Sequence, residues 1–315
     1  MTVFRVRVLA LTLGASVALS PAPQAAIPPA DPHTLDMRLG RQLDSWAASG
    51  RQFLLVDPRG DGRAVEVLGD VSTARHIAVL VPGSDQTLAN FDGGPANPRT
   101  APARTARLLA GAIEAADPGS VALGRTAVVA WLGYDPPDGL LAGARSEPAI
   151  AGARALLRFL HAVNPRGSAH LTMVCHSYGS VVCGHLAPVL RDAPGRVGDI
   201  VVLASPGMDV GSAAELHTTA RLWAARAEGD WIGHVPHLRF AGLGHGADPV
   251  SGYFGACVFS TRGARGHAGY YEPGSESLRN VVRIVLGRGG RVEYAGAAPR
   301  KGCDAHIEGT RDGRE

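Results

Sequence analysis

The segment MVCHSYGSVVCG, residues 173–184, decides how this chain folds. It joins a run of apolar residues to a stretch that can form a helix, and Ser177 stands at the junction. In a parallel sheet such a serine lies at the carboxyl edge of a strand, with the free N–H groups of a helix N-terminus behind it. Ser177 is therefore either a nucleophile with an oxyanion site beside it or an ordinary helix cap, which is common at such junctions.

A turn sharp enough to expose this serine needs small residues two positions before it and two positions after it, because the neighbouring backbones nearly touch. Gly179 fills the second of these positions. Cys175 occupies the first, where the pattern Gly-x-Ser-x-Gly has a glycine, and its side chain is also small. The motif alone leaves both interpretations of Ser177 open, so the rest of the chain has to distinguish them.

The composition is that of an ordinary globular protein. The chain has 315 residues, of which 45% are hydrophobic and 19% are charged, and this length suits one large domain or two small ones. The net charge is +3 and no run of basic residues concentrates it, so we expect no nucleic-acid partner. Lys301 is the only lysine, which leaves no lysine in the body of the fold to act as a catalytic base.

Residues 1–26 have the layout of a secretory signal peptide. Two arginines precede an apolar run over residues 8–19, and small residues and prolines follow. The run is shorter than the ~20 apolar residues that a membrane-spanning helix needs. We expect a secreted or cell-envelope protein with no transmembrane domain in its mature form; an uncleaved N-terminal anchor is the alternative. Residues 27–34 are interpreted as a linker.

Strands and helices alternate along most of the chain. Apolar runs predict a hairpin over 53–68 and strands at 76–83, 126–132, 170–177, 199–207 and 220–226. Helical spacing of apolar residues occurs at 36–50, 105–117, 149–165, 180–193 and 275–287. Buried strands separated by helices predict an α/β fold, with a mostly parallel, doubly wound sheet of about seven or eight strands and helices on both faces. The domain should span residues 35–290, and residues 291–315 should form a loosely ordered tail with one short strand at 291–295.

The chain order of three residue types favours catalysis. Ser177 follows the strand expected at the centre of the sheet, Asp230 follows a later strand, and His267 lies in a Gly-rich loop before the last helix. This Ser, Asp, His order is that of α/β-hydrolases, in which the histidine takes the serine proton and the carboxylate holds the imidazole. Asp209 and Asp248 remain alternatives for the acid, and His245 remains an alternative for the base.

Two backbone N–H groups should stabilise the oxyanion. One belongs to Tyr178, and the other to Ser84 or Asp85 in the turn after the strand at 76–83. Pro/Gly-rich loops at 84–103 and 133–148 should wall the entrance, because too few residues separate the later strands for a large lid. Three further residues are expected to line the site: His176, Trp131 and Tyr134. For Trp131, a position in the core is the alternative.

Four cysteines in an exported chain permit disulfides. We expect Cys257 to pair with Cys303, which would tie the tail to the body, and Cys175 to be buried at a strand end. Neither the cysteines nor the histidines of residues 234–245 have the spacing of a zinc site, so no metal or cofactor is expected.

Four motifs in order resemble one known family: HSYGS, ASPGMDV, RLWAARAEGDWI and the segment at 242–280. They are similar to an actinobacterial family of secreted α/β-hydrolases, formerly catalogued as a domain of unknown function, over most of residues 35–290. The resemblance implies an α/β-hydrolase fold with Ser177 as nucleophile, His267 as base and Asp230 as acid. It implies no particular substrate.

Together these features predict a secreted serine hydrolase that acts on a small-molecule or lipid ester through an acyl-enzyme. Two alternatives remain open. One is an envelope acyltransferase that uses the same triad, and the other is an inactive member of the fold that serves as a binding or structural protein.

Overall fold

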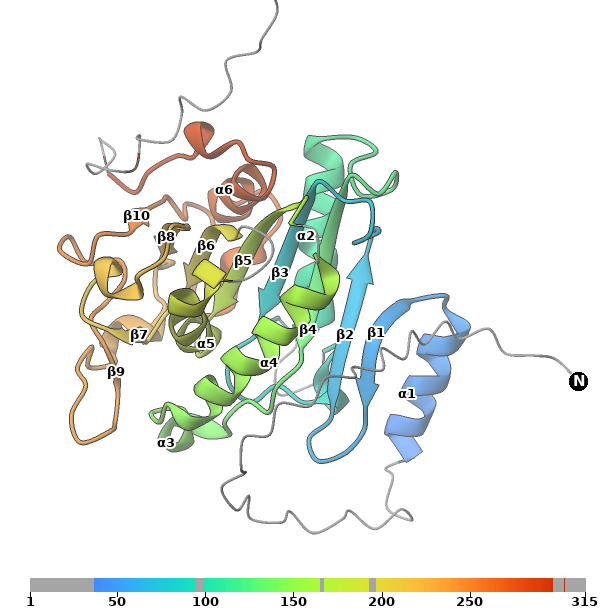
Figure 1. Cartoon of the computed structure of the whole chain (residues 1–315), viewed down its shortest axis with the longest axis horizontal. Coiled ribbons are helices and arrows are strands. Elements are labelled where there is room, and N and C mark those ends of the chain that lie inside the picture. Colours follow the sequence, from blue (N-terminus) through green and yellow to red (C-terminus); the bar gives the residue numbers. More distant parts are fainter. Residues whose placement is uncertain (1–36, 94–98, 165–166, 193–196, 297–302, 304–315) are drawn as a thin grey trace, which may run out of the picture.

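A mixed eight-stranded sheet forms the centre of the molecule (Figure 1). The computed structural model describes residues 37–93, 99–164, 167–192, 197–296 and 303, so the predicted signal peptide and linker lie outside it. The strand order is β1-β2-β4-β3-β5-β6-β8-β10. The strands are β1 (Gln52–Asp57), β2 (Arg63–Leu68), β3 (His76–Val81), β4 (Thr126–Leu132), β5 (His170–His176), β6 (Val197–Leu203), β8 (Arg221–Ala225) and β10 (Cys257–Val258). Only β2 runs antiparallel to its neighbours, which confirms the predicted fold class.

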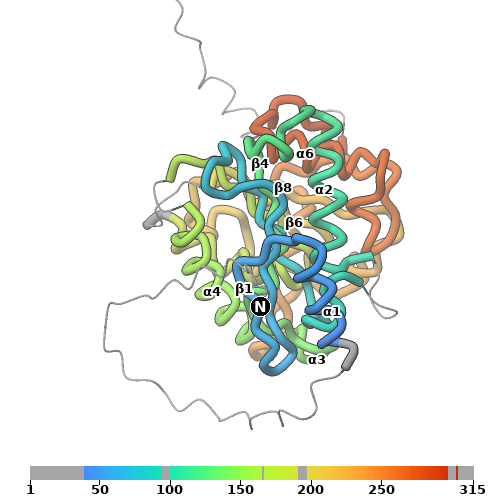
Figure 2. Tube along the Cα trace, turned by 90° about the vertical axis from the view of Figure 1, so that its right-hand side faces the viewer, coloured from blue at the N-terminus to red at the C-terminus, as the bar shows by residue number. Residues whose placement is uncertain are grey.

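Helices cover both faces of this sheet (Figure 2). One face packs against α2 (Pro102–Ala116) and α6 (Glu276–Val285), and the other against α4 (Glu147–Val163) and α5 (Gly179–Leu186). Successive strand residues alternate between the two cores because side chains in a strand point to opposite faces. Thus Ile77 of β3 lies in the core under α4 and α5, and its neighbour Ala78 lies in the core under α2 and α6.

The helices bury the faces that their apolar spacing predicts. In α4, Ala149, Ala153, Leu156 and Leu160 recur every three or four residues and are all buried. At the hairpin end of the sheet, α1 (Met37–Ala48) is fixed through Trp46, whose ring stacks on Phe53 of β1 at 4.7 Å between centroids.

The C-terminal segment is bound to the sheet edge as far as residue 296. Ser260 N donates to Glu293 O at 2.8 Å, and Ala295 N donates to Val258 O at 3.1 Å. The predicted disulfide between Cys257 and Cys303 is present. The expectation of a loose tail is therefore wrong for residues 291–296, where the predicted short strand is reduced to one bridge between Phe259 and Tyr294.

The described chain has no large lid, as expected. Between β6 and β8 lie only β7 (Gly207–Val210) and a short 3-10 helix, Ala213–Leu216. β7 pairs with β9 (His245–Gly246) in a second, two-stranded sheet that the sequence did not predict. Within the described residues, no helix has both the length and the apolarity needed to cross a membrane.

Candidate active site

The junction between β5 and α5 is a strained turn. Ser177 has a φ of +54°, in the left-handed region that residues other than glycine rarely adopt. Its backbone is fixed on both sides, because Ser177 N donates to Leu203 O of β6 and Ser177 O accepts from Ser180 N, each at 2.9 Å. Strain of this kind persists only where the surrounding structure imposes it, and it is concentrated at functional sites.

Two glycines let the backbone of β3 approach this turn. A Cβ on Gly179 would lie 2.4 Å from Val81 O and 2.8 Å from Pro82 O, distances that no side chain could tolerate. A Cβ on Gly83 would lie 2.7 Å from the Cβ of Ser177. The turn after β3 therefore stands directly beside the serine, as an oxyanion site requires.

A disulfide that the sequence did not predict links the strand before this turn to the helix after it. Cys175, the buried residue where a glycine is usual, is bonded to Cys183 in α5, with 6.5 Å between the two Cα atoms. The helix that follows Ser177 folds back over the strand that precedes it, and the two cysteines meet there. The departure from the glycine pattern thus corresponds to a covalent link between strand and helix.

Three side chains distant in sequence form one hydrogen-bonded relay. His267 Nε2 lies 3.0 Å from Ser177 Oγ, and His267 Nδ1 lies 2.8 Å from Asp230 Oδ1. Asp230 is held in turn, since it accepts from Ile232 N at 3.0 Å and from the hydroxyl of Tyr270 at 2.6 Å. Tyr270 was not among the predicted site residues, although it follows His267 by only three positions.

The relay has defined protonation states. Burial alone would raise the pKa of Asp230, but hydrogen bonds from His267, Tyr270 and Ile232 N outweigh it and lower that pKa below its ordinary value. The ionised carboxylate requires a proton on Nδ1 of His267, which leaves the Nε2 lone pair directed at the hydroxyl of Ser177. This arrangement can remove a proton from the serine and return it to a leaving group.

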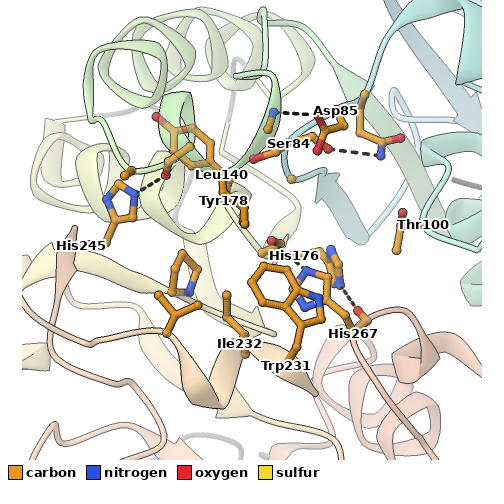
Figure 3. A pocket seen from close by; sticks show the side chains of 18 of the residues that line it. Ser84, Asp85, Thr100, Leu140, His176, Tyr178, Trp231, Ile232, His245 and His267 are labelled. Carbon is orange, nitrogen blue, oxygen red and sulfur yellow. Dashed lines mark hydrogen bonds between the residues drawn. The ribbon is translucent and has the colours of Figure 1, made fainter. Parts of the chain in front are cut away.

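His176 supports the loop that carries His267. Its Nε2 lies 2.7 Å from His267 O, and the two rings are in edge contact (Figure 3). Burial and the neighbouring His267 lower the pKa of His176 to about 3, so this ring is neutral and donates its Nε2–H to the carbonyl. His176 also lines the cavity, as its predicted role requires.

The alternatives for acid and base have other partners. His245 Nδ1 lies 2.9 Å from Asp209 Oδ1, and His245 Nε2 lies 2.7 Å from Gly143 O. Both nitrogens of His245 are thus engaged by acceptors other than Ser177, so His245 is not placed to act as the base. Asp248 is occupied by Arg226 at 2.6 Å.

The two expected oxyanion donors after β3 differ in their availability. Asp85 N donates to Pro137 O at 3.2 Å, and its side chain accepts from Gly139 N at 2.8 Å. The prediction of an oxyanion donor at Asp85 is therefore wrong, because that amide is already bonded. In the described structure the amides of Ser84 and Tyr178 have no such partner, and both residues line the cavity.

A cavity of about 370 Å³ opens over Ser177, a size typical of small-molecule sites. Both predicted loops contribute to it. The first supplies Ser84, Asp85, Gln86 and Thr100, and the second supplies Gly139, Leu140, Gly143 and Ala144. A third wall, within residues 231–245, was not predicted. Its signal in the sequence was a set of large apolar residues within a segment rich in glycine.

Trp131 and Tyr134 are not part of this lining, so their assignment to the site was wrong, whereas the core position given as the alternative for Trp131 is the one observed. Both are buried in the core beneath α4, where their rings stack at 5.7 Å. The hydroxyl of Tyr134 donates to Pro82 O at 2.9 Å. They therefore support the turn after β3 from behind, since β4 directs the side chain of Trp131 toward the helical layer.

The comparisons with known proteins agree with this fold. A model of the alpha/beta hydrolase family matches residues 57–240. The uncharacterized protein Rv2079 of Mycobacterium tuberculosis is 31% identical over 284 residues, which cover 79% of this chain and 41% of that protein. The uncharacterized protein Mb0988c of Mycobacterium bovis is 33% identical over 183 residues, covering 55% of this chain and 64% of that protein. The chain thus spans less than half the length of the first relative.

Solved structures align at low identity. XC6422 of Xanthomonas campestris, described as a serine hydrolase without a lid, is 14% identical and has a TM-score of 0.42, covering 76% of this chain and 94% of that one. An esterase of Rhizomucor miehei is 12% identical with a TM-score of 0.41, covering 82% and 92%. The family match covers more than half of the chain, and the strand order agrees with it. This chain belongs to the alpha/beta hydrolase family.

Proposed function

We propose that this protein is a secreted serine hydrolase that cleaves carboxylic esters through an acyl-enzyme on Ser177. The observation that carries the proposal is the continuous relay from Ser177 Oγ through both nitrogens of His267 to Asp230, with distances of 3.0 and 2.8 Å. The strained turn that presents the serine and the cavity that opens over it support the same conclusion.

The reaction proceeds in two halves. His267 Nε2 takes the proton of Ser177 as Oγ attacks the ester carbonyl, and the same nitrogen then protonates the departing alcohol. Water, deprotonated by His267, attacks the acyl-serine in the second half, releases the acid and restores Ser177. In both halves the oxyanion is stabilised by the amides of Tyr178 and Ser84, each worth ~3 kcal/mol in the transition state.

Esters are favoured over amides because an alkoxide is a better leaving group than an amide anion and therefore depends less on the general acid. Secretion is favoured by the predicted leader and by the two disulfides, Cys175–Cys183 and Cys257–Cys303, since such bonds persist in oxidising compartments.

Labelling with a fluorophosphonate probe tests the nucleophile. We expect the wild type to be labelled and to hydrolyse p-nitrophenyl butyrate, and Ser177→Ala to lose both properties while keeping its melting temperature. Ser72→Ala is a matched control, because Ser72 is an exposed serine in the turn between β2 and β3. Retained turnover in Ser177→Ala would remove the assignment.

The same experiment addresses the alternatives. Folded wild-type protein that is neither labelled nor active would favour an inactive member of the fold. An acyl product that passes to an added alcohol rather than to water would favour acyl transfer.

A further inference from the structure

Exposed apolar side chains are concentrated on two of the segments that wall the cavity. They belong to two segments: α3 (Gly139–Ala142) with the turn that follows it to residue 144, and the stretch 231–244. We call this set the apolar rim, and its members are Leu140, Leu141, Trp231, Leu238, Phe240 and Leu243. Half of the large exposed hydrophobic side chains of the described residues lie in these two segments. Patches of this kind on a soluble domain mark interaction surfaces.

The rim is an ordered part of the site. Phe240 and Leu243 exchange both backbone hydrogen bonds at 2.9 Å, which closes a tight hairpin tip. Gly244 N donates to Ala144 O at 2.9 Å, so this hairpin is joined to the turn after α3. In Figure 1 both segments project at the lower end of the molecule. The apolar side chains are thus carried by two connected segments, and Leu140 and Trp231 among them line the cavity itself.

The cavity that the apolar rim adjoins is apolar as well. Its walls are largely apolar, and the residues concerned are Leu140, Ala144, Pro206, Ile232, Val235 and Pro236. No arginine or lysine lines it among the described residues, and its one carboxylate, Asp85, would repel an anionic substrate group. A carboxylate, phosphate or sulfate on the substrate would therefore find no ionic partner inside. The part of the substrate that enters must be uncharged and apolar.

We propose that the substrate is an ester with an extended apolar acyl chain, presented in a neutral lipid surface, and that the apolar rim inserts into that surface. This inference rests on the proposed function and names its substrate class. The lipid surface is taken as uncharged because the exposed side chains beside the rim have no basic excess that would favour anionic lipids: Arg145 and Arg239 are outnumbered by Asp135, Asp138 and Glu147. Burial of large apolar side chains in lipid supplies the binding energy, and the opened cavity then receives the chain without its passing through water.

Vesicle flotation tests the surface without relying on catalysis. Phosphatidylcholine vesicles are mixed with the secreted chain carrying Ser177→Ala, which cannot consume a substrate. We expect this protein to float with the vesicles. The addition of Leu141→Ser and Phe240→Ser should weaken the binding about tenfold or more, since these side chains are 88% and 84% exposed and do not line the cavity.

Leu123→Ser with Val189→Ser is the matched control. These two apolar side chains are also exposed, at 73% and 43%, but they lie in the turn before β4 and in the 3-10 helix after α5, away from the cavity. The control should bind vesicles as the parent does. Failure of the parent to float, or equal binding by the rim variant, would overturn the inference. A rim that instead holds two copies together, shown by a dimer that the rim variant converts to a monomer, would overturn it as well.

Acyl-chain length tests the cavity independently. On dissolved esters, kcat/KM should rise by up to about fourfold for each added methylene until the cavity is full. The ratio of the rate on a vesicle-borne ester to the rate on a dissolved ester should fall at least fivefold in the rim variant and stay constant in the control. Turnover of dissolved esters without either effect would refute the inference and leave the proposed function standing. Flotation through the rim with no ester turnover would support binding to the lipid surface and refute the proposed function.

Discussion

Two histidines, each held by a buried aspartate, line the same cavity, and only one of them faces the serine. Their Nδ1 contacts are nearly equal, at 2.8 Å from His267 to Asp230 and 2.9 Å from His245 to Asp209. The difference lies at Nε2, which meets a hydroxyl in the first pair and the carbonyl of Gly143 in the second. A hydroxyl can give up a proton and a carbonyl cannot. The pair of His267 and Asp230 can therefore drive a reaction, whereas the pair of His245 and Asp209 joins two walls of the cavity.

The largest expected effect separates the two histidines. His267→Ala should lower kcat on a p-nitrophenyl ester about 10⁶-fold, because the base is lost from a relay that acts as a unit. His245→Ala removes the same side chain from the opposite wall and should cost at most about 100-fold, through a displaced wall. Steady-state kinetics of both variants check the comparison. A comparable collapse in His245→Ala, with the fold intact, would show that the wrong histidine has been assigned as base.

The two aspartates should differ by a smaller factor. Asp230→Asn retains the shape of the carboxylate but favours the wrong tautomer of His267, and kcat should fall on the order of 10⁴-fold. Asp209→Asn should change kcat less than about tenfold, since its partners, His185 and His245, do not contact Ser177. The same ester assay measures both variants. Inverted results would transfer the acid role to Asp209.

Asp209 should matter more for the stability of the protein than for its catalysis. The side chain of Asp209 is almost fully buried, and it is hydrogen-bonded to His185 at 2.7 Å and to His245 at 2.9 Å. Asp209→Asn replaces the charged acceptor of these two buried hydrogen bonds with a neutral amide and should lower the free energy of unfolding by about 3 kcal/mol at pH 7, measured in urea. Asp117→Asn is a control, because its pairs with Arg125 and Arg288 are partly exposed and should contribute less than about 1 kcal/mol. A similar loss in both variants would contradict a structural role specific to the second pair.

The sequence could predict the relay and two walls of the cavity, but not the third wall. Ser177, Asp230 and His267 each follow or precede a strong periodic element, so the parallel sheet brings them to one edge and chain order identifies them. The segment at 231–245 has no such periodicity, and its position depends on single contacts such as Gly244 to Ala144. Trp131 was misplaced for a related reason, because a strand pattern does not show which of two buried faces a side chain occupies.

The two smaller errors have their causes in tertiary packing around the turn. The disulfide between Cys175 and Cys183 depends on how tightly α5 folds back over β5, which spacing along the chain does not reveal. The amide of Asp85 was a reasonable candidate until its bond to Pro137 O, made across two loops, was seen. Both are long-range packing details of a turn whose type had been recognised.

The smallest expected effect concerns the third histidine of the cavity, which has no aspartate. His176 has a pKa of about 3 in the folded protein and about 6.5 when unfolded, so between these values only the unfolded chain takes up a proton. Stability should therefore fall as the pH is lowered through this window, by at most about 1.4 kcal/mol per pH unit from this group. His176→Gln can still donate to the carbonyl of His267 but does not titrate, and urea unfolding at pH 4 to 7 should show a shallower slope for it. An unchanged slope would mean that His176 is already charged in the folded state, and its hydrogen bond to the loop of the base would then need another explanation.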